Sequence, residues 1–317
     1  MPDDTEAHLP RILAVLGPTA SGKSALAVDL AELLTQRMNV PAEIVGTDSM
    51  QAYRGLDIGT ATPTTVERRG IVHHLVDAWD MSYPLTVAEF QAHARSAIDA
   101  IRAGGHVPIV VGGSGLYVSA VLDDLRFPGT DPAIRARLEE ELARDGAAAL
   151  HERLGSLDPV AAEQVLPSNG RRIVRALEVI EITGQPFVAT LPAPESVYPC
   201  VRVGLAIPRA ALDERIERRV LRMWHEGLVD EVRSLATQGL ASAPTASRAL
   251  GYAQALDFLA GECTEDEAIR RTVEATRRFA RRQQRWFLRD DRIRWLAYDS
   301  PSLASDALLA WGSETDT

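Results

Sequence analysis

The sequence is poor in lysine. Of its 317 residues 34 are basic, and reading along the chain shows that 33 of these are arginine and one, Lys23, is lysine. Mutational bias toward GC-rich codons produces an arginine-rich, lysine-poor composition, so the bias itself does not indicate a function. It does not explain why a single lysine persists.

Cysteine, long apolar runs and positive net charge are also scarce. Two cysteines, Cys200 and Cys263, are too few for a disulfide framework or a four-thiolate zinc site, which favours a reducing compartment. No apolar run approaches the roughly 20 residues of a membrane span, and the acidic N-terminal segment does not resemble a signal peptide. We therefore expect a soluble, cytoplasmic protein with no membrane partner. The net charge of -10 requires any nucleic-acid site to be a local patch.

The lone lysine lies in a phosphate-binding motif. The motif G-x-x-x-x-G-K-[ST] is matched by Gly17, Pro18, Thr19, Ala20, Ser21, Gly22, Lys23 and Ser24. Residues 11–16 before it are predicted to form a buried strand, and residues 24–34 after it have helical apolar spacing. Strand, glycine loop and helix are the context that this motif requires.

The chemistry of the loop explains the residue types. Backbone N–H groups of such a loop point at an anion, and the helix N-terminus adds partial positive charge. A lysine ammonium fits there as a compact charge, whereas the broad guanidinium of arginine would crowd the loop. Ser24 is expected to lie beside Mg²⁺.

The rest of the chain alternates strands and helices and is then interrupted. Strands are predicted at 42–45, 107–111 and 201–207, and a helix at 86–103, which indicates an α/β, P-loop NTPase-like core with a parallel sheet flanked by helices. Helices opened by Asp131-Pro132 and Asp158-Pro159, and a third at 171–182, indicate a helical insertion that ends in a linker at 191–196. The predicted divisions are 1–128, 129–196 and 197–317, the last mainly helical with a loosely held tail after Pro301.

An aspartate and a second glycine-rich turn follow two of the predicted strands. Asp48 comes after the strand at 42–45, and Gly112-Gly113-Ser114-Gly115 follows the strand at 107–111. The carboxyl ends of parallel strands meet at one edge of a sheet, so both segments should lie beside the phosphate loop. A carboxylate facing a bound phosphate suggests a general base or a metal ligand. From its position alone Asp48 could also be an N-cap or turn residue, and most Gly-Gly turns are only turns.

A basic segment lies near the C-terminus. Residues 276–289 contain six arginines and no acidic residue. At roughly 100° per residue the arginines fall within an arc of about 140°, with Phe279, Ala280, Trp286 and Phe287 on the opposite arc. A solvated charged face usually alternates in sign, so this strip favours binding to a phosphate backbone.

Together these segments resemble the tRNA dimethylallyltransferases, also called tRNA isopentenyltransferases. The resemblance runs from about residue 12 to residue 296. It rests on GPTASGKS at 17–24, DSMQAYRGLDIGTA at 48–61, HHLVD at 73–77, VGGSGLY at 111–117, RIVRALE at 172–178, RIERR at 215–219, ALGY at 249–252 and TRRFARRQQRWF at 276–287. It implies transfer of a dimethylallyl group from dimethylallyl diphosphate to the exocyclic amine of the adenosine just 3′ of a tRNA anticodon, with release of diphosphate.

The resemblance also implies roles for individual residues. Asp48 would accept the proton of the amine, and Thr19 and Arg219 would help Lys23, the loop amides and Mg²⁺ to stabilise the leaving diphosphate. The implied tRNA contacts are Asp48, Ser49, Met50, Gln51, Ser114, Arg171, Arg172, Ile173, Val174, Arg175, Arg248, Gly251, Tyr252, Arg277, Arg281 and Arg285. The insertion and the basic helix would clamp the anticodon stem-loop, whose target base leaves its stack more cheaply than in a duplex. We expect a monomer.

The chain departs from the family pattern at a few positions, and three alternatives stay open. Thr62 and Ala253 stand where the family usually has basic residues, and Ser114 replaces threonine while keeping the hydroxyl. A P-loop small-molecule kinase would need an acidic residue where the strand at 107–111 ends in Gly112-Gly113. An adenylate isopentenyltransferase acting on free nucleotide leaves the arginine strip and the insertion unexplained. A non-catalytic RNA-binding module leaves the phosphate loop and Asp48 without a role.

Overall fold

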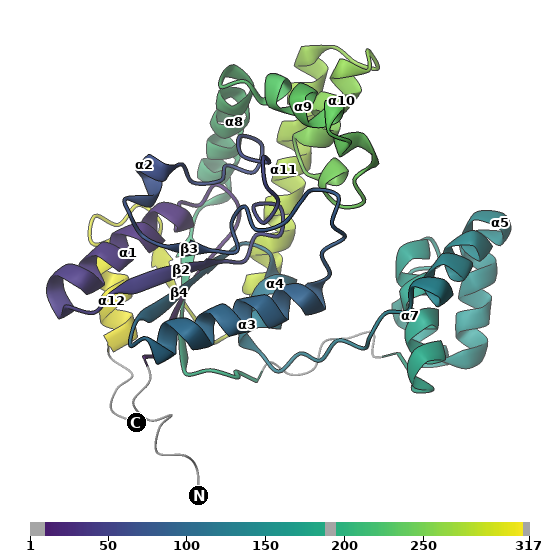
Figure 1. Ribbon diagram of the computed structural model, residues 1–317, viewed down its shortest axis with the longest axis horizontal. Coiled ribbons are helices and arrows are strands. Elements are labelled where there is room, and N and C mark those ends of the chain that lie inside the picture. The colour runs from purple at the N-terminus through teal and green to yellow at the C-terminus, as the bar shows by residue number, and fades with distance from the viewer. Residues whose placement is uncertain (1–9, 188–194, 313–317) are drawn as a thin grey trace, which may run out of the picture. The chain divides into compact units, whose positions relative to one another are not determined.

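A parallel β-sheet forms the centre of the larger of two units (Figure 1). The structure is a computed structural model, and it describes residues 10–187 and 195–312. Within these residues six strands lie in the order β3-β2-β4-β1-β5-β6, and every neighbouring pair is parallel. The strands are β1 (Ile12–Leu16), β2 (Ala42–Gly46), β3 (His73–His74), β4 (Val107–Gly112), β5 (Cys200–Ala206) and β6 (Ile293–Ala297). The predicted fold class is confirmed.

Helices cover both faces of this sheet. The described helices of the larger unit are α1 (Lys23–Met38), α2 (Thr65–Arg68), α3 (Val87–Ala103), α4 (Gly115–Leu122), α8 (Arg209–His225), α9 (Leu228–Thr237), α10 (Tyr252–Leu259), α11 (Glu265–Phe287) and α12 (Leu303–Gly312), with 3-10 turns η2 (Leu240–Ser242) and η3 (Ala246–Arg248). Successive side chains of a strand point to opposite faces. Accordingly Leu13 and Val15 of β1 pack with α1 and α12, whereas Ile12 and Leu16 pack in the cluster that contains α3, α4, α8 and α11. None of the helices in the described ranges is both long and apolar enough to cross a membrane.

The predicted strands at 11–16, 42–45, 107–111 and 201–207 and the helices at 24–34 and 86–103 are confirmed within a few residues. Thr86 begins α3 with a capping box, in which Glu89 N donates to the Thr86 hydroxyl and Glu89 accepts from Thr86 N. The expectation of a loose tail after Pro301 is wrong for residues 303–312. These residues form α12, whose Trp311 is buried and donates to Arg11 O at 3.3 Å.

The smaller unit, residues 125–194, is helical where it is described. It contains α5 (Pro132–Leu157), α6 (Pro159–Gln164) and α7 (Gly170–Thr183), packed around Leu138, Leu154 and Leu177. Asp131 and Asp158 accept hydrogen bonds from the first-turn amides of α5 and α6, as their Asp-Pro pairs predicted. Residues 191–194 of the predicted linker lie outside the described residues.

The chain leaves and re-enters the larger unit through a buried ionic cluster. Asp123 and Ser196 form an antiparallel bridge at this point. The carboxylate of Asp123 accepts from Arg202 at 2.7 Å and from Arg292 at 2.8 Å, and Arg202 also bonds Asp290 at 2.9 Å. Asp123 and Arg202 are almost fully buried, so each charge depends on its partners. We refer to Asp123, Ser196, Arg202, Asp290 and Arg292 as the neck cluster.

Candidate active site

The phosphate loop connects β1 to α1, as its motif predicted. Gly17 and Gly22 have φ values of 153° and 106°, which side-chain-bearing residues rarely adopt. Gly22 caps α1 without a side-chain hydrogen bond, and the first turn of α1 carries no acidic residue. The helix therefore keeps its N-terminal N–H groups and its partial positive charge for an anion.

Lys23 is the first residue of α1, and its surroundings disfavour the charged form of its side chain. Its Nζ donates to Pro18 O at 3.1 Å. Burial, and next the positive charge of Arg219, lower the pKa of Lys23 to about 8, while Asp48 acts in the opposite direction. An anion bound beside Nζ would stabilise the charged ammonium and so offset the effects of burial and of Arg219.

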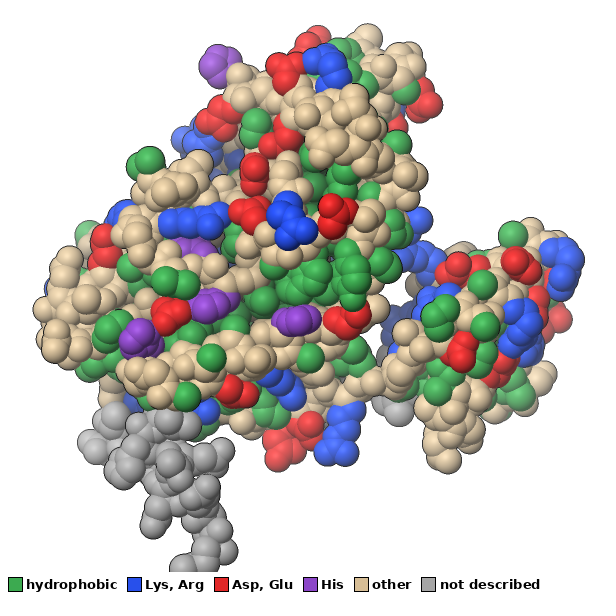
Figure 2. All heavy atoms as spheres, in the orientation of Figure 1, with side chains coloured by type: hydrophobic (Ala, Val, Ile, Leu, Met, Phe, Trp, Pro, Cys, Tyr) green, Lys and Arg blue, Asp and Glu red, His purple; other side chains and the backbone are tan. Residues whose placement is uncertain are grey.

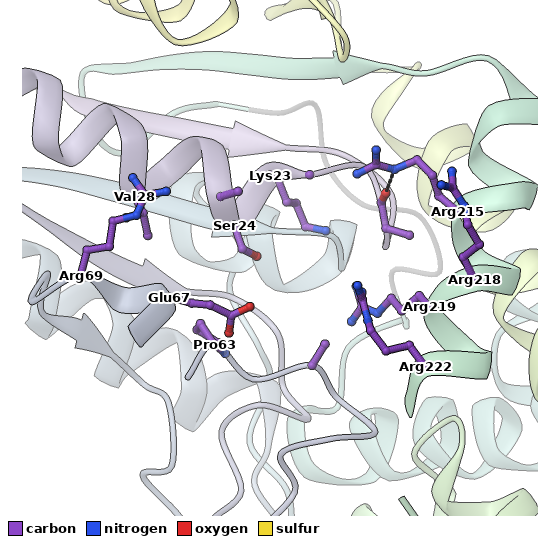
Figure 3. Close-up of a pocket in the computed structure, with 14 residues that line it drawn as sticks. Lys23, Ser24, Val28, Pro63, Glu67, Arg69, Arg215, Arg218, Arg219 and Arg222 are labelled. Carbon is purple, nitrogen blue, oxygen red and sulfur yellow. Dashed lines mark hydrogen bonds between the residues drawn. The ribbon is translucent and has the colours of Figure 1, made fainter. Parts of the chain in front are cut away.

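A cavity of about 460 Å³ lies next to the loop. Figure 3 shows Lys23 and Ser24 at the start of α1 on one side of it and four arginines of α8 on the other. Its charged lining residues are Lys23, Glu67, Arg69, Arg215, Arg218, Arg219 and Arg222, and its neutral ones are Ala20, Gly22, Ser24, Ala25, Val28, Ala61 and Pro63. Arg69 is bonded to Asp29 at 2.8 Å and Glu32 at 2.9 Å, but the other five cations still outnumber Glu67, so the cavity is suited to an anion with several charges.

Arg215 and Arg219 of α8 contact the loops around the cavity. Arg215 Nε donates to Ala20 O of the phosphate loop at 2.7 Å, and Arg219 Nη2 donates to Thr60 O at 3.2 Å. Neither arginine forms a salt bridge within the described ranges, whereas the more exposed Arg218 lies near Glu214 of α8 and Arg222 near Glu226, directly after α8. Burial lowers the pKa of Arg219, and the nearby Asp48 opposes the effect. Arg219 is thus a half-buried guanidinium near Asp48 that forms no salt bridge within the described ranges, and its charge favours a bound anion.

Arg219 was predicted for this site, but Arg215, Arg218 and Arg222 were not. The signal was present in the sequence, because residues at i, i+3, i+4 and i+7 share one face of a helix. The resemblance covers residues 215–219 only, and the helical spacing extends the same face to Arg222.

Asp48 follows β2 and acts as a turn residue with one of its two oxygens. Its Oδ1 accepts from Met50 N at 3.0 Å, which confirms the turn interpretation for that oxygen. Within residues 10–187 and 195–312 its Oδ2 has no hydrogen-bond partner. The negative charge of the carboxylate acts to raise the pKa of both Lys23 and Arg219. One oxygen fixes the side chain while the other remains able to accept a proton.

Residues next to Asp48 hold a second loop in place. Gln51 Nε2 donates to Thr60 O and Ala61 O, both at 3.1 Å. Thr62 is buried, and its hydroxyl lies 2.8 Å from that of Thr60 and donates to Leu56 O at 3.2 Å. Thr62 thus stabilises the loop from within, and its side chain is not available to RNA.

The second glycine-rich turn lies against the phosphate loop, as its place after β4 predicted. A Cβ on Gly112 would lie 1.7 Å from Thr47 Oγ1, and a Cβ on Gly113 would lie 3.1 Å from Gly17 O. Only glycine allows these close approaches. Ser114 begins α4, and its hydroxyl makes no capping hydrogen bond.

The comparison with protein families covers α8 and α11 of this site but not the phosphate loop or Asp48. The family described as IPP transferase matches residues 51–291. The chain belongs to the IPP transferase family. This is a family of prenyl-transferring enzymes, since its curated members that resemble this chain are named tRNA dimethylallyltransferase.

Individual IPP transferases resemble the chain over nearly its whole length. The tRNA dimethylallyltransferase of Thermobifida fusca is 62% identical and is matched over 93% of this chain and 92% of its own. The tRNA dimethylallyltransferase of Streptomyces avermitilis is 61% identical, with 95% of each chain covered. The crystal structure of the tRNA isopentenylpyrophosphate transferase of Bacillus halodurans aligns with a TM-score of 0.69 at 37% identity and covers 96% of this chain and 97% of its own.

The basic helix of this IPP transferase is α11, and it shows the two predicted faces. Ala280 and Phe287 are buried, and Arg278, Arg282, Arg285 and Arg289 are exposed. On the face in Figure 2, Lys and Arg side chains are interspersed with Asp and Glu, so that face does not have a uniform basic surface.

The predicted tRNA residues of α11 differ in their contacts. The side chain of Arg277 is already hydrogen-bonded within the protein, because it donates to Glu217 at 2.7 Å and to Asp213 O at 3.2 Å, both on α8. Arg281 and Arg285 have no carboxylate partner in the described part of the chain, and Arg285 Nε donates only to Arg281 O. Arg281 and Arg285 stay predicted tRNA contacts, whereas Arg277 holds α11 against α8.

The predicted tRNA residues of α7 also divide. Arg171 and Arg172 are exposed, whereas Ile173 and Val174 lie in the core of the insertion. We withdraw these two side chains as tRNA contacts, because apolar side chains at core spacing pack inward. Arg175 bonds Glu178 at 2.7 Å and Pro128 O at 2.6 Å, so it holds the start of the insertion.

Tyr252 needs the same correction. Its side chain is fully buried, its hydroxyl donates to Glu231 at 2.5 Å, and its ring occupies the space where a Cβ on Gly59 would lie. Tyr252 therefore stabilises the loop that contains Thr60 and does not face RNA. Gly251 has a φ of 89° and begins α10, and Arg248 is exposed at the end of η3.

Proposed function

We propose that this chain is a tRNA dimethylallyltransferase. It transfers the dimethylallyl group of dimethylallyl diphosphate to the exocyclic amine of the adenosine just 3′ of the anticodon and releases diphosphate. The observation that carries the proposal is the cavity of six cations around the phosphate loop, with Asp48 acting on the charges of Lys23 and Arg219. The names of relatives about 60% identical support the same activity.

The diphosphate of the donor occupies the cationic cavity. Residues 17–24 supply N–H groups and the Lys23 ammonium, and Arg219 supplies a half-buried guanidinium. When the allylic C–O bond breaks, its electron pair goes to the diphosphate oxygen, whose charge therefore grows. Hydrogen-bond donors fixed around that oxygen stabilise the transition state more than they stabilise bound dimethylallyl diphosphate. The hydroxyl of Thr19 is proposed to join them.

Asp48 accepts the proton of the attacking amine. An adenine amine is a weak nucleophile, because its lone pair is delocalised into the ring, so removal of its proton during attack helps. The turn bond from Met50 N holds the carboxylate through Oδ1 and leaves Oδ2 for this role. The new C–N bond, the broken C–O bond and the proton on Asp48 balance the reaction.

The residues around Ser24 fit Mg²⁺ held mainly by the substrate. Ser24 is exposed and lines the cavity, and residues 10–187 and 195–312 contain no group of three or more His, Cys, Asp or Glu side chains suited to a metal. Magnesium takes oxygen ligands and is often bound through substrate phosphates and one or two protein oxygens. The Ser24 hydroxyl would supply such an oxygen, and the ion would neutralise charge on the diphosphate when bound.

The tRNA anticodon stem-loop is the acceptor. The exposed Arg285 and the half-buried Arg281 of α11 support contact with the phosphate backbone, and the exposed Arg171 and Arg172 of α7 are proposed as further contacts. Ser49, Ser114 and Arg248 remain proposed contacts near the loops. We include in the proposal that the enzyme acts as a monomer in the cytoplasm, where its tRNA substrate is found.

A transfer assay tests the proposal against its rivals. Labelled dimethylallyl diphosphate is incubated with unmodified tRNA and, separately, with AMP, and the label in each acceptor is measured. We expect label in tRNA and none in AMP. Label in AMP alone would identify an adenylate isopentenyltransferase, and binding of tRNA without transfer would identify an RNA-binding module. Phosphate transfer from ATP to a small molecule would identify a kinase, which the Gly112-Gly113 end of β4 disfavours.

A further inference from the structure

Gln283 connects the basic helix α11 to the phosphate loop. Its side chain is buried, and its Oε1 accepts a hydrogen bond from Thr19 N at 2.8 Å, across 264 positions in the sequence. A backbone N–H can only donate, so this contact fixes the orientation of the amide: the oxygen faces the loop, and the nitrogen faces away from Thr19.

The nitrogen end of this amide lies beside Lys23. A Cβ on Gly113 would lie 2.6 Å from Gln283 Nε2 and 3.3 Å from Lys23 Nζ, so the two nitrogens border the same small space next to Gly113. Within the described ranges Nε2 donates to no protein acceptor, and solvent can reach it. A nearly buried amide keeps N–H groups without a protein partner only where water or a ligand accepts them.

The position of Gln283 is fixed by the packing of α11 on both sides. The ring of Trp286, one turn further along α11, fills the space where a Cβ on Gly115 would lie, at 2.2 Å. Arg277, nearly two turns earlier, is bonded to Glu217 of α8. A donor held in this way is preorganised, because little side-chain freedom is lost when a ligand accepts its hydrogen bond.

We propose that Gln283 is a diphosphate-binding residue. Its Nε2 donates to a non-bridging oxygen of the diphosphate beside Lys23, while its Oε1 holds the phosphate loop at Thr19. The inference rests on the function proposed above and adds a residue to its site. As the C–O bond of the donor breaks and its electron pair moves onto the diphosphate, the bond from Nε2 strengthens, so Gln283 contributes to the rate as well as to affinity.

Binding of inorganic pyrophosphate, measured by titration calorimetry in the presence of Mg²⁺, tests this role. Gln283→Glu keeps the size and an oxygen for Thr19 N but replaces the donating nitrogen by a second acceptor. Gln284→Glu introduces the same charge at the next position and serves as the matched control. We expect Gln283→Glu to weaken binding roughly 10- to 100-fold, as loss of a charge-assisted hydrogen bond does, and Gln284→Glu to change it less than about threefold.

Two further measurements keep the test decisive. Circular dichroism and a denaturant titration report whether each variant is folded, and the cooperative unfolding transition should be retained in both. If Gln283→Glu does not fold, Gln283→Leu removes the donor without adding charge and should weaken pyrophosphate binding roughly tenfold. The transfer rate at saturating donor should also fall in the Gln283 variants, which loss of ground-state binding alone would not cause.

The results separate this inference from the proposed function. A folded Gln283→Glu enzyme that binds pyrophosphate as tightly as Gln284→Glu would overturn the assignment, even if the wild type prenylates tRNA. A wild type that binds pyrophosphate but transfers no prenyl group to tRNA would overturn the proposed function, while selective loss of binding in Gln283→Glu would still support the assignment.

Discussion

Raising the pH above 8 should weaken diphosphate binding through Lys23. Burial and Arg219 lower the pKa of Lys23 to about 8 in the unliganded protein. A bound diphosphate favours the charged ammonium and raises this pKa. Affinity for diphosphate is therefore highest well below pH 8, where nearly every Lys23 side chain is protonated before binding. It falls as the pH rises through 8, because binding must then take up a proton.

The size of the effect follows from this pKa. A group with a pKa of about 8 is roughly 90% charged at pH 7 and about 3% charged at pH 9.5. If only the charged form binds, Kd for pyrophosphate should rise about 30-fold over this interval. If the enzyme with neutral Lys23 also binds pyrophosphate weakly, Kd rises less steeply near pH 9.5.

Titration calorimetry with inorganic pyrophosphate at constant ionic strength measures this dependence, with Lys23→Arg as the control. Arginine stays charged throughout this range, so the variant should show a flatter profile, and titration of pyrophosphate itself is common to both proteins. The variant should also bind less tightly and turn over more slowly, because a guanidinium is too broad for the loop. A wild-type Kd that is constant from pH 7 to 9.5, or a fully active Lys23→Arg enzyme, would refute this account of the lone lysine.

Three other substitutions test separate parts of the structure. Asp48→Asn should lower the transfer rate by about 100-fold or more while tRNA is still retained on a filter, and a failure to bind tRNA with normal turnover per bound tRNA would argue against a general base. Replacing Arg281 and Arg285 by Gln should weaken tRNA binding and reduce the slope of log K against log salt by about 0.7 to 0.9 for each phosphate that is no longer neutralised, whereas an unchanged slope would disprove the phosphate contacts. Asp123→Asn should lower the free energy of unfolding by about 1–3 kcal/mol in a denaturant titration, because Arg202 and Arg292 then share one carboxylate, Asp290, in place of two. An unaltered denaturation midpoint would show that the neck cluster does not stabilise the fold.

The parts of the site that depend on local sequence could be predicted. The phosphate loop, Asp48 and the Gly112-Gly113 turn each follow a strand of a parallel sheet, and this topology alone brings them to one edge. The Asp-Pro pairs predicted the helix starts of the insertion, because capping is a local interaction.

The parts that depend on packing could not be read from the sequence in the same way. Gln283 reaches Thr19 only because α11 folds back over the loop, and a glutamine within an arginine-rich segment gives no sign of this contact. Arg277 lies on the predicted strip, yet α8 binds it through Glu217. The family motif implies RNA contacts for Ile173 and Val174, whereas their apolar character predicts the burial that the structure has.

The central claim is tested most directly by the acceptor base itself. The protein, labelled dimethylallyl diphosphate and Mg²⁺ are combined with an anticodon stem-loop that has adenosine 3′ of the anticodon, and with the same RNA carrying guanosine at that position. The account predicts one prenyl group on the adenosine RNA, one pyrophosphate released for each group transferred, and no label on the guanosine RNA. Equal labelling of both RNAs, or release of pyrophosphate without any labelled RNA, would contradict it.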